Sequence, residues 1–133
     1  MDLFIGIDKL DASCARLLFY AKTGFMEGPV AMGWQRVSLR DLNLARSTPQ
    51  QALLSFAGSQ PISEGEIMPV EIEILPSSTL FRAGDSLQLT VQGHDLFDHP
   101  MLHHADTVNA VQHVLQGGRT YDPHLPVPVI PLR

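Results

Sequence analysis

Aliphatic and acidic residues alternate in the middle of the chain. Residues 69–74 read Pro-Val-Glu-Ile-Glu-Ile, and residues 87–92 read Leu-Gln-Leu-Thr-Val-Gln. A period of two turns successive side chains to opposite faces of a strand, so both stretches predict half-buried strands. The connection over residues 75–86 is rich in the turn formers Pro, Ser, Gly and Asp. We therefore expect the two strands to form a β-β unit.

Aliphatic and aromatic residues concentrate in further short stretches. Residues 3–7, 16–21 and 31–39 are of this kind, and each predicts a strand because glycine, proline or aspartate residues separate them. Near the end, residues 113–116 precede a Gly-Gly pair. Residues 127–131 read Val-Pro-Val-Ile-Pro, and this stretch is expected at a sheet edge because proline has no N–H to donate.

Helical patterning is weak. Ser38 and Asp41 have the spacing of a capping box, in which each side chain accepts a hydrogen bond at the N-terminus of a helix. This pair predicts a helix of one or two turns at most. Residues 46–66 hold Ser-Thr-Pro, Gly-Ser-Gln-Pro and Glu-Gly-Glu, which predicts a long surface connection. Short strands with turns between them and no helical partner predict an all-β, antiparallel sandwich, with residues 1–133 as a single domain.

Charge and composition exclude several classes of protein. The net charge is −5 and the 9 Lys and Arg residues are scattered, so no basic stripe is available for nucleic acid. No apolar run approaches the roughly 20 residues that a membrane-spanning helix needs. The start at Met1-Asp2 lacks the positive charge of a signal peptide. Cys14 is the only cysteine, so no intrachain disulfide forms, and we expect a cytoplasmic protein.

The stretch 93–109 is rich in potential metal ligands. Its histidines and aspartates are His94, Asp95, Asp98, His99, His103, His104 and Asp106. This density of ligands is what a zinc site requires. However, Gly93 and Pro100 disfavour a helix that would align them, and no cysteine joins the set. We therefore expect a hydrogen-bonded loop without metal and assign the chain no cofactor.

Other candidate chemistry has simpler interpretations. Trp34 and Phe25 are suited to stack on a sugar ring, but Trp34 lies in a predicted strand and is expected in the core. Glu71 and Glu73 fall on one face of their strand and are interpreted as a solvated surface. Ser, His and Asp are all present, but the Gly-x-Ser-x-Gly string of an α/β-hydrolase nucleophile is absent. We expect no catalytic residues and no activity from this chain alone.

The stretch 69–84, Pro-Val-Glu-Ile-Glu-Ile-Leu-Pro-Ser-Ser-Thr-Leu-Phe-Arg-Ala-Gly, closely resembles the C-terminal domain of the cocaine esterase and Xaa-Pro dipeptidyl-peptidase superfamily of serine hydrolases. The resemblance extends to residues 2–6, 9–11, 33–38, 46–49 and 127–131. It implies a jelly-roll sandwich of galactose-binding-like shape, packed against an α/β-hydrolase domain that carries the catalytic serine. Leu75 stands where the family often has tryptophan, and Asp85 where it often has histidine.

The resemblance also implies that the first strands of the sandwich are missing: either the sequence begins inside the sandwich, or another chain completes it. A sheet edge is then expected to be open to another chain. The long loop 93–109 contains apolar side chains that require a partner. Its candidate interface residues are Leu96, Phe97, His99, Met101 and Leu102. The expected partners are the α/β-hydrolase domain and a second copy of the chain in a homo-oligomer.

Three functions remain open at this point. The leading interpretation is a non-catalytic domain that supports the hydrolase domain and forms walls around the access to its substrate. The alternative is a free-standing jelly-roll module that binds a carbohydrate or a protein through its loops, which a concave face with exposed aromatic residues favours. A stand-alone enzyme that uses the histidine-rich loop needs a metal or a nucleophile that the sequence does not provide.

Overall fold

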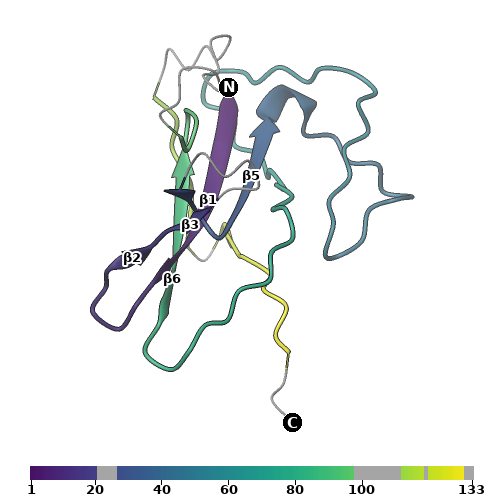
Figure 1. Ribbon diagram of the computed structural model, residues 1–133. Helices are drawn as coiled ribbons and strands as arrows, with labels where there is room; N and C mark the ends of the chain where they lie inside the picture. The colour runs from purple at the N-terminus through teal and green to yellow at the C-terminus, as the bar shows by residue number, and fades with distance from the viewer. Residues whose placement is uncertain (21–26, 98–111, 119, 131–133) are drawn as a thin grey trace.

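One long strand organises the fold. β1 (Asp2–Leu10) pairs along one edge with β5 (Ala31–Arg36) and then with β2 (Arg16–Leu17), and along its other edge with β6 (Ser86–Gln92) (Figure 1). All three pairings are antiparallel. The computed structural model describes residues 1–20, 27–97, 112–118 and 120–130. The described part contains no α-helix, and the prediction of an all-β antiparallel protein is confirmed.

The apolar run near the N-terminus explains the central position of β1. Residues 2–6 are all buried, as expected for a strand that has neighbours on both edges. The strand predicted over residues 3–7 continues as far as Leu10, where a turn begins at Asp11. The strand predicted over residues 87–92 is also confirmed, but its partner is β1 and not residues 69–74.

The register of the sheet assigns its side chains to two faces. Residues directly opposite each other in neighbouring strands share a face. Phe4 pairs with Trp34 on β5 and Gly6 pairs with Thr90 on β6, so these residues lie together on what we call the Phe4 face. The opposite surface, the Ile5 face, is made by Leu3, Ile5, Ile7, Lys9, Ala31, Gly33, Gln35, Leu87, Leu89 and Val91. The Ile5 face is therefore mainly aliphatic, and the Phe4 face mixes aromatic and polar residues.

The prediction of a strand at residues 69–74 is wrong. These residues belong to no strand, although Val70, Ile72 and Ile74 are half-buried as the alternation indicated. The following Leu75 donates its N–H to the Met32 carbonyl of β5 at 2.8 Å. Alternation in a sequence specifies which side chains are covered, whereas a strand also needs a neighbour that supplies backbone hydrogen bonds.

Gly33 allows this segment to approach β5 closely. A Cβ atom at this position would fall closer than 3.0 Å to the Glu73 carbonyl oxygen and 3.2 Å from the Ile74 Cα atom. Both are backbone atoms, which cannot rotate away. Only glycine therefore fits where the segment crosses β5.

Two other predicted extended stretches are shorter than expected or unpaired. The stretch 16–21 divides into β2 and β3 (Phe19–Tyr20), and β3 pairs with β4 (Glu27–Gly28) in a separate small sheet. Residues 113–116 are exposed and belong to no strand. The predicted edge strand at 127–131 is also wrong over its described part, because residues 127–130 pair with no strand. The prolines there cannot donate to a ladder, and no edge among the described strands reaches them.

The stretch 31–39 ends as a turn and not as a strand. β5 stops at Arg36, and a short 3-10 helix, η1 (Val37–Leu39), follows. The predicted capping box is wrong: Arg36 is the N-cap residue, and its side chain makes no capping hydrogen bond. Asp41 instead accepts a hydrogen bond from the Ser55 hydroxyl at 2.7 Å. Among the helices of the described residues, none has the length and hydropathy needed to span a membrane.

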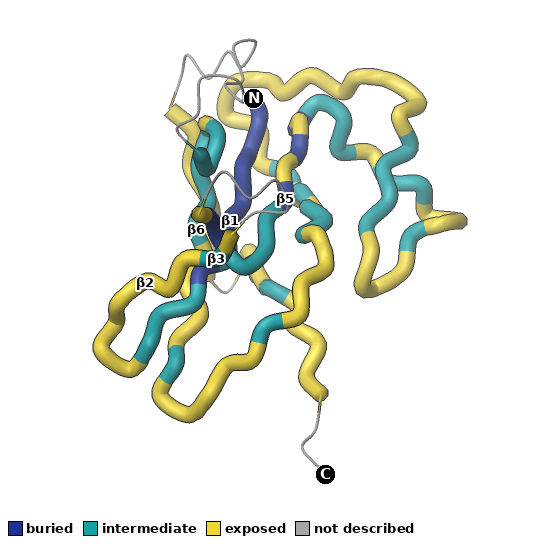
Figure 2. The backbone as a smooth tube through the Cα atoms, in the orientation of Figure 1, coloured by how far each residue is buried: buried dark blue, intermediate teal, exposed yellow. Residues whose placement is uncertain are grey.

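The buried core of the described residues is small. Its hydrophobic members are Leu3, Phe4, Ile5 and Val37, all in β1 or directly after β5 (Figure 2). The chain exposes 10488 Å², whereas a folded monomer of its mass is expected to expose about 6,900 Å². The difference of about 3,600 Å² belongs to the chain as a whole, including the residues outside the described ranges.

Candidate interaction surface

An aromatic cleft lies at one end of the Phe4 face. It has a volume of about 330 Å³ and is lined by Asp2, Phe4, Trp34, Gln35, Arg36, Leu39, Leu54 and Phe56. The prediction that Trp34 belongs to the core is wrong, because 60% of this residue is exposed. Phe4 is the buried member of the pair, and Trp34 lies beside it toward the edge of the sheet.

A folded connection brings Leu54 and Phe56 to the cleft. Leu42 and Leu54 form an isolated bridge, and the Ser55 N–H donates to the Asp41 carbonyl at 2.8 Å. Phe56 follows with a φ of 51°, in the left-handed region that bulky residues seldom adopt, and it remains 69% exposed. The sequence carried no signal for this position, because a positive φ at phenylalanine cannot be inferred from residue type.

Two residues that line the cleft, Asp2 and Arg36, form an ion pair. The Arg36 Nε and Nη2 atoms donate to the two carboxylate oxygens of Asp2 at 2.9 and 2.8 Å. The Asp2 side chain is only 8% exposed, and the Arg36 side chain is 47% exposed. This two-point geometry stabilises a carboxylate that would otherwise be buried without compensation.

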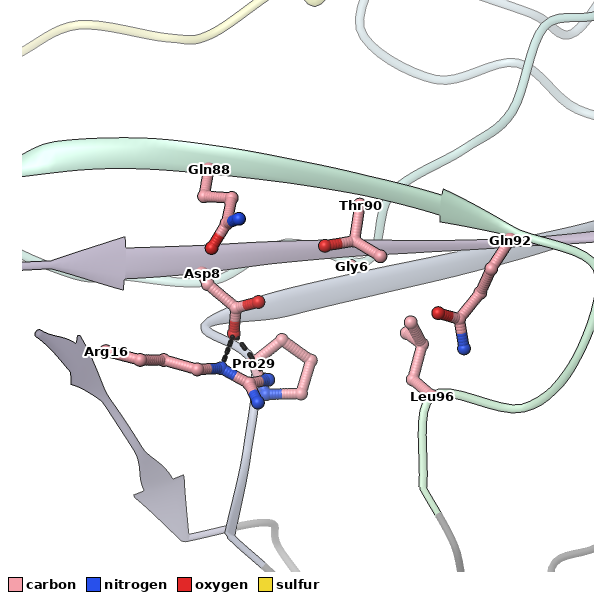
Figure 3. A pocket seen from close by; sticks show the side chains of 8 residues that line it. All are labelled: Gly6, Asp8, Arg16, Pro29, Gln88, Thr90, Gln92 and Leu96. Carbon is pink, nitrogen blue, oxygen red and sulfur yellow. Dashed lines mark hydrogen bonds and ion pairs between the residues drawn. The ribbon is translucent and has the colours of Figure 1, made fainter. Parts of the chain in front are cut away.

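A polar pocket occupies the other end of the Phe4 face (Figure 3). It holds about 210 Å³ and is lined by Gly6, Asp8, Arg16, Pro29, Gln88, Thr90, Gln92 and Leu96. Asp8 is buried and accepts from the Arg16 Nε atom at 2.8 Å, and the Arg16 Nη2 atom lies 2.7 Å away. The Arg16 side chain remains 47% exposed. Each end of the Phe4 face therefore carries a half-exposed guanidinium on a buried aspartate.

Two of the candidate interface residues contact the protein's own strands. Leu96 lies over Gly6, where an added Cβ atom would come within 3.1 Å of its side chain. The Phe97 ring lies so close to Gly28 that a Cβ atom there would approach it closer than 3.0 Å. Both residues are half-buried. His99, Met101 and Leu102 lie outside the described residues, so the interface at this loop stays a prediction.

The histidine-rich stretch is described only at its start. The His94 Nδ1 atom lies 3.1 Å from the Gln92 Nε2 atom and 3.0 Å from the Asp95 carbonyl oxygen, which makes it part of a hydrogen-bonded turn. The ligand candidates outside the described residues are Asp98, His99, His103, His104 and Asp106. In the part of the chain that the structure describes, no three His, Cys, Asp or Glu residues are grouped to hold a metal ion.

The remaining residues singled out in the sequence make contacts of their own, are exposed, or lie outside the described residues. Phe25 lies outside the described residues. Glu73 accepts a hydrogen bond from the Gln51 Nε2 atom at 2.9 Å, while Glu71 is exposed. Cys14 is an exposed free thiol.

Asp85, one of the two residues that depart from the pattern of the family that the sequence resembles, forms an ion pair. Its carboxylate lies 2.8 Å from the Lys9 Nζ atom, and Lys9 also donates to the Leu80 carbonyl at 2.6 Å and lies 5.5 Å from the centre of the Phe81 ring. The hydrogen bond from Lys9, together with that from the Arg82 N–H, lowers the pKa of Asp85 below its ordinary value. These contacts tie the connection before β6 to β1.

Comparison with known families gives a match over most of the chain. The sequence pattern of the family described as the X-Pro dipeptidyl-peptidase C-terminal non-catalytic domain matches residues 1–125. Among curated proteins, a search found no match.

Two solved structures are similar, and both are described as a CocE/NonD family hydrolase from Staphylococcus aureus. One is 41% identical with a TM-score of 0.70 and matches 73% of this chain and 18% of its own chain. The second is 39% identical with a TM-score of 0.77 and matches 82% of this chain and 21% of its own chain. This chain therefore spans about a fifth of the length of the hydrolases that it matches.

Proposed function

Because this chain belongs to the family of X-Pro dipeptidyl-peptidase C-terminal non-catalytic domains, we propose that it supports the α/β-hydrolase domain of a larger serine hydrolase and forms walls of its substrate access. The match over residues 1–125 carries this proposal, and the two similar hydrolases support it. The reactions proposed for the parent enzyme are the cleavage of Xaa-Pro dipeptides or of acyl esters in the cytoplasm. We extend the proposal to the finer architecture, a galactose-binding-like jelly roll.

The exposed surface of the chain supports the proposal that this domain packs against another part of its protein. Large apolar side chains of the central sheet remain exposed, including Trp34 at 60% and Leu89 at 46%. A domain that remains this open is expected to be covered by other parts of its protein. We also propose a homo-oligomer. Its basis is the outer edge of β6, which has no strand partner among the described residues and is therefore open to a strand of a second copy.

Among the described polar contacts, no serine hydroxyl lies next to a histidine. Within the described residues, the hydrogen-bonded serine hydroxyls are those of Ser13, Ser47 and Ser55, and their partners are aspartate or backbone atoms. The serine nucleophile of an α/β-hydrolase needs a histidine base within hydrogen-bond reach. We therefore assign the catalytic serine of the proposed hydrolase to its other domain.

The proposal is tested on the gene that encodes this chain. We expect its reading frame to encode an α/β-hydrolase domain with a Gly-x-Ser-x-Gly string. A fluorophosphonate probe should then label one serine in that domain and none in residues 1–133. Labelling inside this chain together with turnover of a nitrophenyl ester by the chain alone would contradict the proposal.

One observation favours the second candidate, a free-standing module that binds a carbohydrate or a protein. Trp34 and Phe56 are both exposed and both line one cleft, and exposed aromatic residues of this kind bind sugar rings and proline-rich segments. A reading frame without a hydrolase domain, combined with glycan-array binding that Trp34→Ser abolishes, would favour this candidate over the first.

A further inference from the structure

We propose that the aromatic cleft on the Phe4 face is the surface through which this domain docks onto the α/β-hydrolase domain, with Trp34 and Phe56 as its anchors. This inference rests on the proposed function. It adds the specific face and the specific side chains that make the contact.

The position of Trp34 requires a partner from outside the sandwich. In a β-sandwich, a second sheet covers one face of the first, and the more aliphatic face is the natural interior. Here that is the Ile5 face, where Leu87 and Leu89 are still 39% and 46% exposed. Trp34 pairs with Phe4 on the opposite face. Closure of the sandwich over the Ile5 face would therefore leave Trp34 uncovered.

The side chains of the cleft have the composition of an interface centre. Trp and Arg are the residues most enriched among those that contribute strongly to protein binding, and aromatic residues are enriched at interfaces in general. The cleft places Trp34, Phe56 and Arg36 together with the aliphatic Leu39 and Leu54. Trp34 and Arg36 stand on β5, which is hydrogen-bonded to the central strand, so they are held in place before a partner binds.

The charges of the Phe4 face define the chemistry of the partner. Arg36 and Arg16 stand at its two ends, each paired with a buried aspartate and each 47% exposed. Exposed guanidinium groups bind carboxylates and carbonyl oxygens. The complementary surface of the hydrolase domain should therefore present an apolar protrusion that enters the cleft, with acidic or carbonyl groups on both sides of it.

The length of the similar hydrolases favours a folded domain over a small ligand. About four-fifths of each hydrolase lies outside the part that this chain matches, so a large folded domain is available to cover the Phe4 face. A ligand in the cleft of about 330 Å³ would cover only a small part of this face. Leu96, the first of the predicted interface residues, also lies on this face, over Gly6. The cleft and Leu96 therefore lie on the same face of the sheet.

The test is hydroxyl-radical footprinting with detection by mass spectrometry, on residues 1–133 alone and on the full polypeptide encoded by the gene. We expect oxidation of Trp34 and Phe56 to be at least about fivefold slower in the full polypeptide, because interface centres exclude water. Tyr20 on β3 is the control, since it is 78% exposed and lies outside the cleft. Its oxidation rate should be the same in both samples.

A pair of variants completes the test. Trp34→Ser in the full polypeptide should return the oxidation rate of Phe56 to that of the isolated chain, whereas Tyr20→Ser should leave it slow. In the isolated chain, Trp34→Ser should leave the circular dichroism spectrum unchanged because Trp34 is mostly exposed.

The outcomes separate this inference from the proposed function. Equal oxidation of Trp34 and Phe56 in both samples would overturn the docking surface, while fluorophosphonate labelling of the same polypeptide would still uphold the proposed function. A reading frame without a hydrolase domain would overturn both.

Discussion

Replacement of Gly33 by alanine tests whether the segment that precedes Leu75 is packed on β5. The added methyl group would approach the Glu73 carbonyl oxygen closer than 3.0 Å and its carbonyl carbon to 3.1 Å. Since these are backbone atoms, the segment has to move away from β5. The hydrogen bond from the Leu75 N–H to the Met32 carbonyl, now 2.8 Å long, would then lengthen or break.

The magnitude follows from three contributions. Overpacking of this kind costs typically about 1–3 kcal/mol, and the lost hydrogen bond costs about 0.5–1.5 kcal/mol. Replacement of glycine also restricts the unfolded chain, which returns about 0.4–1 kcal/mol. We expect Gly33→Ala to lower the free energy of unfolding by about 2 kcal/mol in total.

Urea unfolding monitored by circular dichroism measures this change. With a typical slope of about 2 kcal/mol per molar urea, the midpoint should fall by about 1 M. Gly58→Ala is the matched control, because no atom lies within 4 Å of the Cβ atom it would add. This control should be neutral or slightly stabilising. If the two variants have the same midpoint, the segment is not held against β5, and the packing described above is wrong.

Three further results are expected. Asp85→Asn should remove a component of acid unfolding, because the contact with Lys9 lowers the folded-state pKa of Asp85. The stabilisation by Asp85 is therefore present above the ordinary pKa of about 4 and is lost as the pH falls through the lower folded-state pKa. Urea unfolding of both proteins from pH 2 to 6 measures this loss, and identical pH profiles would exclude the role of Asp85. Ile72→Asp should lower the free energy of unfolding by about 1–2 kcal/mol, because it places a carboxylate at a half-buried position. Glu71→Gln, at an exposed position, should change the free energy of unfolding little. Equal urea midpoints for the two variants would show that the buried side of residues 69–74 is assigned incorrectly. Analytical ultracentrifugation of the isolated chain at micromolar concentration should detect a dimer that Phe97→Ser weakens, and a monomer in both cases would disprove self-association.

Much of the central sheet could be predicted from residue types. The apolar run at residues 3–7 and the alternation at 87–92 correspond to β1 and β6, because hydrophobic patterning determines which side chains need cover. The pairing of these strands could not be predicted. A strand at residues 69–74 was expected beside β6, but β1 occupies that place. Local patterns carry no information about which distant segment supplies the hydrogen bonds.

The candidate surface was predictable only in part. Trp34 was recognised as a residue able to bind a ligand, but it was assigned to the core, since strand patterning does not say which face becomes the interior. Phe56 carried no signal, because its place beside Trp34 depends on a connection that folds back through the Leu42 and Leu54 bridge. The predicted loop residues Leu96 and Phe97 lie against Gly6 and Gly28, and only the three-dimensional structure could show these contacts.

The sequence by itself determined the all-β class and the family, because both depend on short-range patterns: alternation, turn residues and the string over residues 69–84. The tertiary structure alone decided which strand is central, which face carries Trp34, and that Asp2 with Arg36 and Asp8 with Arg16 form ion pairs at the two ends of that face. The physical reason is that Asp2 and Arg36 are 34 positions apart in the chain and meet only because β1 and β5 pair in one particular register. Register results from the packing of the whole sheet, so the surface that it creates cannot be derived from any single segment.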